Sequence, residues 1–139
     1  MFLRSVLVGL LFFGATTPAL AQAAPAKKST ITAATPAPDD RARQWLVLVD
    51  DKNYAQSWSE AAKAFQSRQK TDGWAAGAAT TRAPLGAVAS RGLKSIDLSR
   101  GNTAVIRYDT VFAHKAAAIE TVTLIFENGS WSVTDYSVD

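Results

Sequence analysis

The chain has 139 residues, of which 15 are Lys or Arg, 12 are Asp or Glu, one is His and none is Cys. This length fits one domain and is too short for two ordinary ones. The lack of Cys excludes disulfides, a zinc–thiolate cluster and a cysteine nucleophile, and a single His excludes a multi-histidine metal site. We therefore expect no metal and no other cofactor.

The first 21 residues have the three-part layout of a secretory signal peptide. Arg4 gives a positive start, residues 5–13 form an apolar run too short to span a bilayer, and residues 19–21 (Ala-Leu-Ala) form a small-x-small cleavage site. These features predict export of the chain with cleavage after residue 21. They also predict that no integral membrane segment is left after cleavage.

Residues 22–38 have the composition of a flexible linker, with three prolines and no aromatic residue. Such a segment buries too little apolar surface to offset the entropy lost on ordering. Arg4, Lys27 and Lys28 are the basic residues outside 39–139, which leaves 12 basic and 12 acidic residues in a single formally neutral domain. Nucleic-acid binding depends on a basic surface, so we expect no nucleic-acid partner.

Apolar periodicity predicts three helices in the first half of this domain. Apolar residues spaced i, i+3, i+4, i+7 over residues 42–49 predict a helix that begins near Asp39. A second apolar stripe over residues 54–65 predicts another helix. The third is expected to begin at Thr71 and to end before Pro84, because proline disfavours helical backbone in the residue that precedes it.

After Gly86 the apolar period changes from about four to two, which is the spacing of β-strands. Strands are predicted over residues 88–98, 103–112, 119–127 and 131–138. Helices followed by antiparallel strands predict an α+β fold, with three helices on one face of a four-stranded antiparallel meander. By analogy, this layout resembles the cone-shaped cystatin-like folds, which include the nuclear-transport-factor-like (NTF2-like) group.

The last hairpin permits a prediction of register. Asn128-Gly129 between two apolar strands predicts a two-residue type I′ turn, in which the numbers of paired residues sum to 257. Continued along the strand, this register leaves Tyr136 on the wrong face. A β-bulge near Thr134-Asp135 changes the sum to 258 and returns Tyr136 to the core face, so we predict a bulge there.

Several motifs follow one another along roughly residues 40–138: Trp45-Leu46-x-Leu48-Val49-Asp50, Tyr54-x-x-Ser57-Trp58, Arg82-Ala-Pro84-Leu85-Gly86 and Gly129-Ser130-Trp131-Ser132-Val133. In this order they resemble the bacterial family called domain of unknown function 4019. The family's usual glycine before the closing aromatic is Asp135 here. The resemblance implies an exported protein, periplasmic or secreted, of a Gram-negative bacterium, and it implies no particular reaction.

Arg82 and Arg91 flank the corner where helices give way to strands, and they are the main candidate binding residues. One hypothesis is an anion site at the open end of the cone, lined by Tyr108 and Trp58, because arginine binds carboxylates and phosphates through paired hydrogen bonds. The alternative is structural: both arginines bind internal acids such as Asp50, Glu60 or Glu120.

Lys115 and Glu120 complete the candidate site residues. Glu120 alternates with Val122 and is expected to face inward, where it needs a partner such as Lys115, Arg82 or Arg91. Lys115 and Glu120 could instead pair only to hold the turn between two strands. No nucleophile motif accompanies His114, so we assign no catalytic residue and expect a solvated surface imidazole.

These observations favour an exported, non-catalytic domain that binds either a small ligand, with an anion as one alternative, or a protein partner. A homodimer could form through the outer sheet face, where Val105, Val111 and Ile125 are expected. The alternative function is a small-molecule enzyme of the isomerase or hydratase kind, with an Asp base and a tyrosine donor in the cone pocket.

Overall fold

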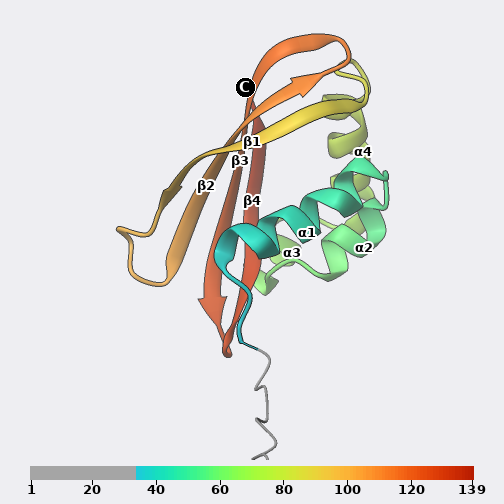
Figure 1. Cartoon of the computed structure of the whole chain (residues 1–139). Coiled ribbons are helices and arrows are strands. Elements are labelled where there is room, and N and C mark those ends of the chain that lie inside the picture. Colours follow the sequence, from blue (N-terminus) through green and yellow to red (C-terminus); the bar gives the residue numbers. More distant parts are fainter. Residues whose placement is uncertain (1–33) are drawn as a thin grey trace, which may run out of the picture. The chain divides into compact units, whose positions relative to one another are not determined.

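The computed structural model describes residues 34–139 (Figure 1). The predicted signal peptide and residues 22–33 of the predicted linker lie outside the described residues. The helices are α1 (Pro38–Asp50), α2 (Tyr54–Ser59), α3 (Lys63–Arg68) and α4 (Thr71–Arg82), and the strands are β1 (Val88–Asp97), β2 (Thr103–Phe112), β3 (Lys115–Glu127) and β4 (Ser130–Val138). None of the helices in the described range is long and apolar enough to cross a membrane.

Helix α1 lies where the first apolar stripe predicts it and α4 where the third helix is expected, but the prediction of one helix over residues 54–65 is wrong. That segment forms two short helices, α2 and α3, so the domain has four helices in the described residues instead of three. The break at residues 60–62 has a clear cause. The backbone N–H of Ala62 donates to the carbonyl of Val133 in β4 (2.8 Å), and the Gln66 amide donates to three carbonyls next to the break.

The strands form one antiparallel sheet in the order β1-β2-β3-β4, which confirms the predicted meander. The predicted hairpin register is also correct. Glu127 pairs with Ser130, and the register shifts by one residue after Leu124–Val133, so that Thr123 pairs with Asp135. Asn128 and Gly129 both have positive φ, at 52° and 79°, as a type I′ turn requires.

Strand β3 begins at Lys115, four residues earlier than predicted, so the connection to β2 is two residues long instead of six. The short connection is held from outside the sheet. Backbone N–H groups of Ala113 and His114 donate to the carbonyls of Ala87 and Leu85, at 2.8 and 2.9 Å. The loop that leads into β1 therefore supports the turn between β2 and β3.

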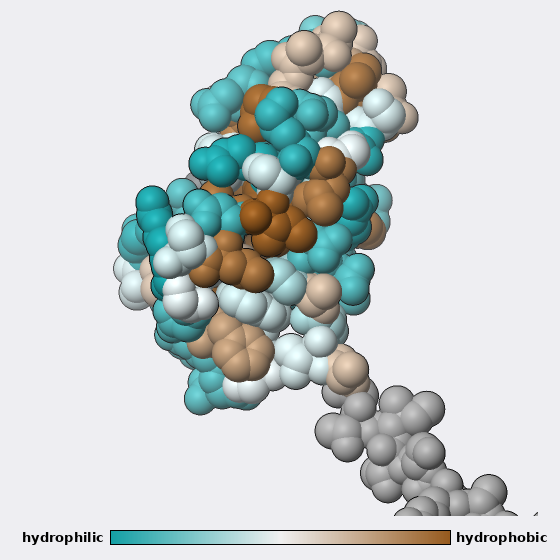
Figure 2. Space-filling view, turned by 60° about the vertical axis from the view of Figure 1, so that its left-hand side comes forward, coloured by the Kyte–Doolittle hydropathy of each residue, from teal (hydrophilic) through white to brown (hydrophobic). Residues whose placement is uncertain are grey.

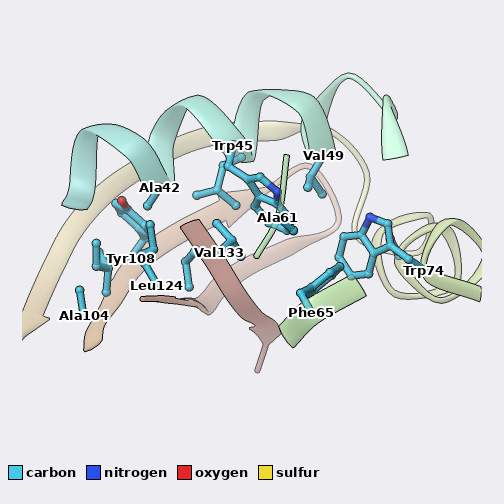
Figure 3. Close-up of a cluster of buried hydrophobic side chains, with 14 residues drawn as sticks. Ala42, Trp45, Val49, Ala61, Phe65, Trp74, Ala104, Tyr108, Leu124 and Val133 are labelled. Atoms are coloured by element: carbon cyan, nitrogen blue, oxygen red, sulfur yellow. The ribbon is translucent and has the colours of Figure 1, made fainter. Parts of the chain in front are cut away.

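The hydrophobic core lies between α1 and the inner face of the sheet, with aromatic side chains at the end near α3 and α4 (Figure 3). Helix α1 packs mainly on β2, β3 and β4. Trp45 lies 5.7 Å from Trp74 and 6.3 Å from Phe65, and Tyr136 lies 5.6 Å from Trp45, all measured between ring centroids. Tyr136 reaches this group because the bulge turns it inward.

Candidate functional site

Four charged side chains from four different elements meet where α1 and α4 end. Arg82 of α4 donates to Asp50 of α1 (Nη2 to Oδ1, 2.6 Å) and to Glu120 of β3 (Nη1 to Oε1, 3.3 Å). Arg91 of β1 donates to both Asp50 oxygens (2.8 and 3.0 Å) and to Glu120 Oε2 (2.6 Å). These four residues are called the ion cluster below. Its formal charge is zero.

Glu120 is fully buried and receives two more hydrogen bonds. The Thr110 hydroxyl donates to Oε2 (2.6 Å) and the Tyr136 hydroxyl donates to Oε1 (2.7 Å). Tyr136 in turn accepts a bond from Arg82 Nη1 (3.0 Å). A buried carboxylate is tolerated only when its oxygens are satisfied, and here four donors surround it.

The hydrogen bonds of the cluster favour the charged forms of Asp50, Arg82 and Arg91. Burial by itself raises the pKa of Asp50, but hydrogen bonds from Arg91 and Arg82 outweigh that effect and keep the pKa below its ordinary value. Burial lowers the pKa of Arg91, yet its bonds to Asp50 and Glu120 raise the pKa above the ordinary value. Burial and the adjacent Glu120 charge raise the pKa of Tyr136. Tyr136 therefore stays protonated and remains a hydrogen-bond donor.

This geometry corresponds to the structural alternative for the two arginines. They converge on internal acids, Asp50 and Glu120, whereas Glu60 pairs with Arg41 (3.3 Å). Arg82 also lies over the Phe112 ring, 4.9 Å from its centroid, and its buried Nε has no hydrogen-bond partner among the described residues.

The other candidate residues lie apart from the cluster. Tyr108 is buried in the core, where its hydroxyl donates to the Asp39 carbonyl (3.3 Å) and burial raises its pKa to about 12. The Trp58 indole donates to the Gln69 carbonyl (2.8 Å). Lys115 makes no ion pair with another described residue. Of the three partners considered for Glu120, the two arginines bond to it and Lys115 does not, and Thr110 and Tyr136 supply the other bonds that Glu120 accepts.

Beside the ion cluster is a cavity of about 700 Å³, within the usual range of small-molecule pockets. It lies among the ends of α1 and α4, the start of α2 and the loop before β1. Its lining residues, which define the cavity below, are Val49, Asp50, Lys52, Tyr54, Ala79, Arg82, Ala83, Gly86, Ala87 and Val88. The cavity is therefore mostly apolar, with one wall formed by Asp50 and Arg82.

Gly86 keeps this end of the domain closely packed. Its φ is +76°, and a Cβ added there would lie 2.7 Å from Cδ2 of His114 and 3.0 Å from Cβ of Ala113. His114 is exposed, as its polar surroundings predict. The imidazole thus covers the glycine loop. No group of three or more metal-ligating side chains occurs in residues 34–139.

Sequence reasoning missed Thr110 and Tyr136 as partners of Glu120. Thr110 alternates with Tyr108 and Phe112 on β2, so strand periodicity alone places it on the inner face. Tyr136 pairs with Val122, two residues from Glu120 on the same face of β3. The predicted bulge could therefore have identified Tyr136 as a partner of Glu120, because the bulge turns the tyrosine inward.

The outer sheet face does not bring the three predicted aliphatic side chains together. Val105 lies near Ile125, because it pairs with Thr123, which is two residues from Ile125 on the same face of β3. Val111 lies six residues farther along β2, about 20 Å away, and the exposed side chains of Arg107 and Asp109 lie between them on the same face. Dimerisation through this face stays a prediction.

Other exposed aliphatic side chains lie on the inner side of β1. Leu93 and Ile96 pair with Tyr108 and Ile106 and so point toward the core side, yet they are 42% and 40% exposed. They are exposed because α1 packs mainly on β2, β3 and β4. Figure 2 shows strongly apolar side chains side by side on one face of the domain.

The fold places the protein in a known class. A candidate NTF2-like transpeptidase from Campylobacter jejuni has a similar crystal structure, with a TM-score of 0.50 and 20% sequence identity over 70% of this chain and 97% of that one. The chain thus has an NTF2-like α+β fold. The family model for a protein of unknown function, DUF4019, matches residues 41–136, and the chain belongs to that family. No curated protein sequence is significantly similar to it.

Proposed function

We propose that this protein is an exported, non-catalytic domain that binds a small molecule in the cavity beside the ion cluster. The observation that carries the proposal is the cavity itself, about 700 Å³ in volume, in which Val and Ala supply half of the lining residues. The export part rests on the signal-peptide features of residues 1–21.

Two polar groups in the cavity, from Lys52 and Tyr54, indicate which polar or charged group the ligand has. The Lys52 ammonium and the Tyr54 hydroxyl make no hydrogen bond within the described part of the chain, whereas Asp50 and Arg82 bond to each other. Lys52 is therefore the one charge in the cavity wall that no described residue neutralises. A ligand with an apolar body and one anionic group, such as a carboxylate, fits this lining best.

The hydrogen bonding of Asp50 and Glu120 favours a binding function over the alternative of an isomerase- or hydratase-like enzyme. A general base must be free to take a proton. Asp50 is held by two guanidinium groups that keep its pKa low, so it is a poor base. Glu120 lies beside the Tyr136 hydroxyl, but it is buried, fully bonded and not part of the cavity lining.

Filling the cavity tests its role. Ala79→Trp on α4 places a large ring at an exposed lining position, and Ala64→Trp on α3 is the matched control at an exposed position outside the cavity. We expect Ala79→Trp to abolish binding of short aliphatic and aromatic carboxylates in calorimetry, and Ala64→Trp to leave it unchanged. Equal binding by both variants would rule out the cavity as the site.

The charge preference has its own test. We expect a carboxylate to bind more tightly than the amide of the same carbon skeleton, and Lys52→Gln to remove that difference, because the ammonium that no described residue neutralises is lost. Native mass spectrometry of the protein purified from its own host then identifies the natural ligand. Conversion of that ligand into a product by the pure protein would favour the enzyme alternative.

A further inference from the structure

The four tryptophans differ in what their indole N–H groups bind. Three donate to acceptors inside the domain: Trp45 to the Ser57 carbonyl, Trp74 to the Ser57 hydroxyl and Trp58 to the Gln69 carbonyl. Trp131 donates to no acceptor in residues 34–139, its N–H is not among the fully buried groups that lack a partner there, and its side chain is only partly buried. An indole donor that faces solvent is available to a ligand.

Trp131 is part of an aromatic platform at the β3–β4 hairpin. It pairs across the strands with Phe126, and the ring centroids are 5.2 Å apart at an angle of 57°. Phe126 is 37% exposed and Trp131 is partly buried against the core. The platform therefore contacts the core through Trp131 and is exposed at Phe126.

A hollow of about 280 Å³ lies against this platform. Its lining residues, which define the hollow, are Pro36, Arg41, Gln44, Ser130, Trp131 and Ser132. The Gln44 amide and the Ser132 hydroxyl make no hydrogen bond within the described residues, and Gln44 is exposed. Arg41 is neutralised by Glu60, which accepts from both of its terminal nitrogens at 3.3 Å. The hollow thus offers an indole ring and uncharged polar groups without an unpaired charge.

We propose that this hollow binds a neutral sugar ring. One face of a pyranose consists of C–H groups that pack on an aromatic ring, and its edge carries hydroxyls that pair with amide, hydroxyl and indole groups. The hollow supplies both types of surface, and it lacks a free charge that would select an ionic ligand. Its volume is below the range of about 300–1,000 Å³ typical of drug-sized ligands, which suits a single ring, either free or at the end of a glycan.

This site is separate from the cavity beside the ion cluster. Arg41, Gln44 and Trp131 are not among the cavity lining residues. The proposal therefore does not depend on the proposed function. Either site can be wrong without affecting the other.

Nuclear magnetic resonance of the indole N–H groups tests the proposal directly. The probes are glucose, N-acetylglucosamine and the β-1,4-linked dimer of each, with glucuronate as the charged comparison. We expect the Trp131 indole signal, assigned by its loss in Trp131→Phe, to shift and saturate with the neutral sugars while the other three indole signals stay in place. Tighter binding of the dimers would indicate the end of a glycan, and equal binding a free monosaccharide.

Two variants weaken the contact in different ways. Trp131→Phe keeps a ring but removes the donor, and Gln44→Ala removes the amide on an exposed helix face, so each should weaken sugar binding about fivefold, the cost of one hydrogen bond. Gln69→Ala is the control, because its side chain lies outside the hollow. Binding for both hollow variants is followed by the quenching of intrinsic fluorescence or by calorimetry.

The proposal is overturned if the Trp131 signal does not move at high millimolar sugar, or if all four indole signals shift together. It is also overturned if Gln44→Ala binds sugar as the wild type does. Gln44 is exposed and outside the core, so this variant remains informative even if Trp131→Phe fails to fold.

Discussion

The two ends of the domain differ in whether their polar side chains have partners within the described residues. Where α1 and α4 end, the ion cluster pairs four charges with one another; Glu120 and Arg82 are buried, and Asp50 and Arg91 are partly buried. At the β3–β4 hairpin, the Trp131 indole and the Gln44 amide have no hydrogen-bond partner within residues 34–139, and they lie beside a partly exposed aromatic pair. A closed network fixes the positions of the elements that it joins, whereas unpaired groups at a hollow are available to a ligand.

The ion cluster joins α1, α4, β1 and β3 through side chains alone, which makes it the most costly place to break. Glu120→Ala removes the acceptor of bonds from two arginines, Thr110 and Tyr136. We expect the free energy of unfolding to fall by about 3–5 kcal/mol, because Arg82 and Arg91 then keep only Asp50 as a counter-charge inside the domain. Urea denaturation measures the change.

The surface pair between Lys94 and Asp109 (2.8 Å) is the control for this comparison, since both side chains are about half exposed. Asp109→Ala is expected to cost less than about 1 kcal/mol, as exposed pairs do. Equal losses for Asp109→Ala and Glu120→Ala would show that burial of the cluster contributes nothing.

The loss of stability at low pH gives a second comparison, between the wild type and Asp50→Asn. The folded state lowers the pKa of Asp50 below 3.8, so the unfolded chain takes up the proton first. Asp50 therefore stabilises the fold above its ordinary pKa, and this contribution is lost as the pH falls below that value. We expect Asp50→Asn to lower stability at neutral pH and to flatten the decline in acid. An acid decline as steep as that of the wild type would contradict this assignment.

Two glycines with nearly the same backbone conformation sharpen the contrast between the two ends. Gly129 (φ +79°) at the hairpin has open space where a Cβ would lie, whereas Gly86 (φ +76°) at the cavity end would contact His114 and Ala113. We expect Gly129→Ala to cost about 1–2 kcal/mol from backbone strain alone. Gly86→Ala should cost more, and His114→Ala should recover part of the difference. Thermal unfolding of the variants checks the order.

The strand half of the fold follows closely from the sequence. Alternation predicts the buried side chains of β2, and Asn128-Gly129 with the position of Tyr136 predicts the hairpin register and its bulge. These features are local, since a turn type and a period of two depend on neighbouring residues. The helical half depends more on residues distant in the sequence. The apolar stripe over residues 54–65 does not reveal the helix break, because that break depends on the Val133 carbonyl in β4.

For the candidate site too, some features follow from the sequence and others only from the tertiary structure. Periodicity places Glu120 inward and Arg82 and Arg91 at the corner between helices and sheet. Only the tertiary structure decides that Asp50 and Glu120 occupy both arginines, and that Tyr108 and Trp58 belong to the core instead of a shared pocket. The distinction has a physical basis, because distances between side chains depend on how separate elements pack.

The sequence by itself determined the type and order of nearly all elements, the sheet register at the last hairpin and the neutrality of the folded domain. The tertiary structure decided which charges neutralise one another and which polar groups remain free. Burial creates that difference: a charge removed from water must find an internal partner, while a group at the edge of the core does not.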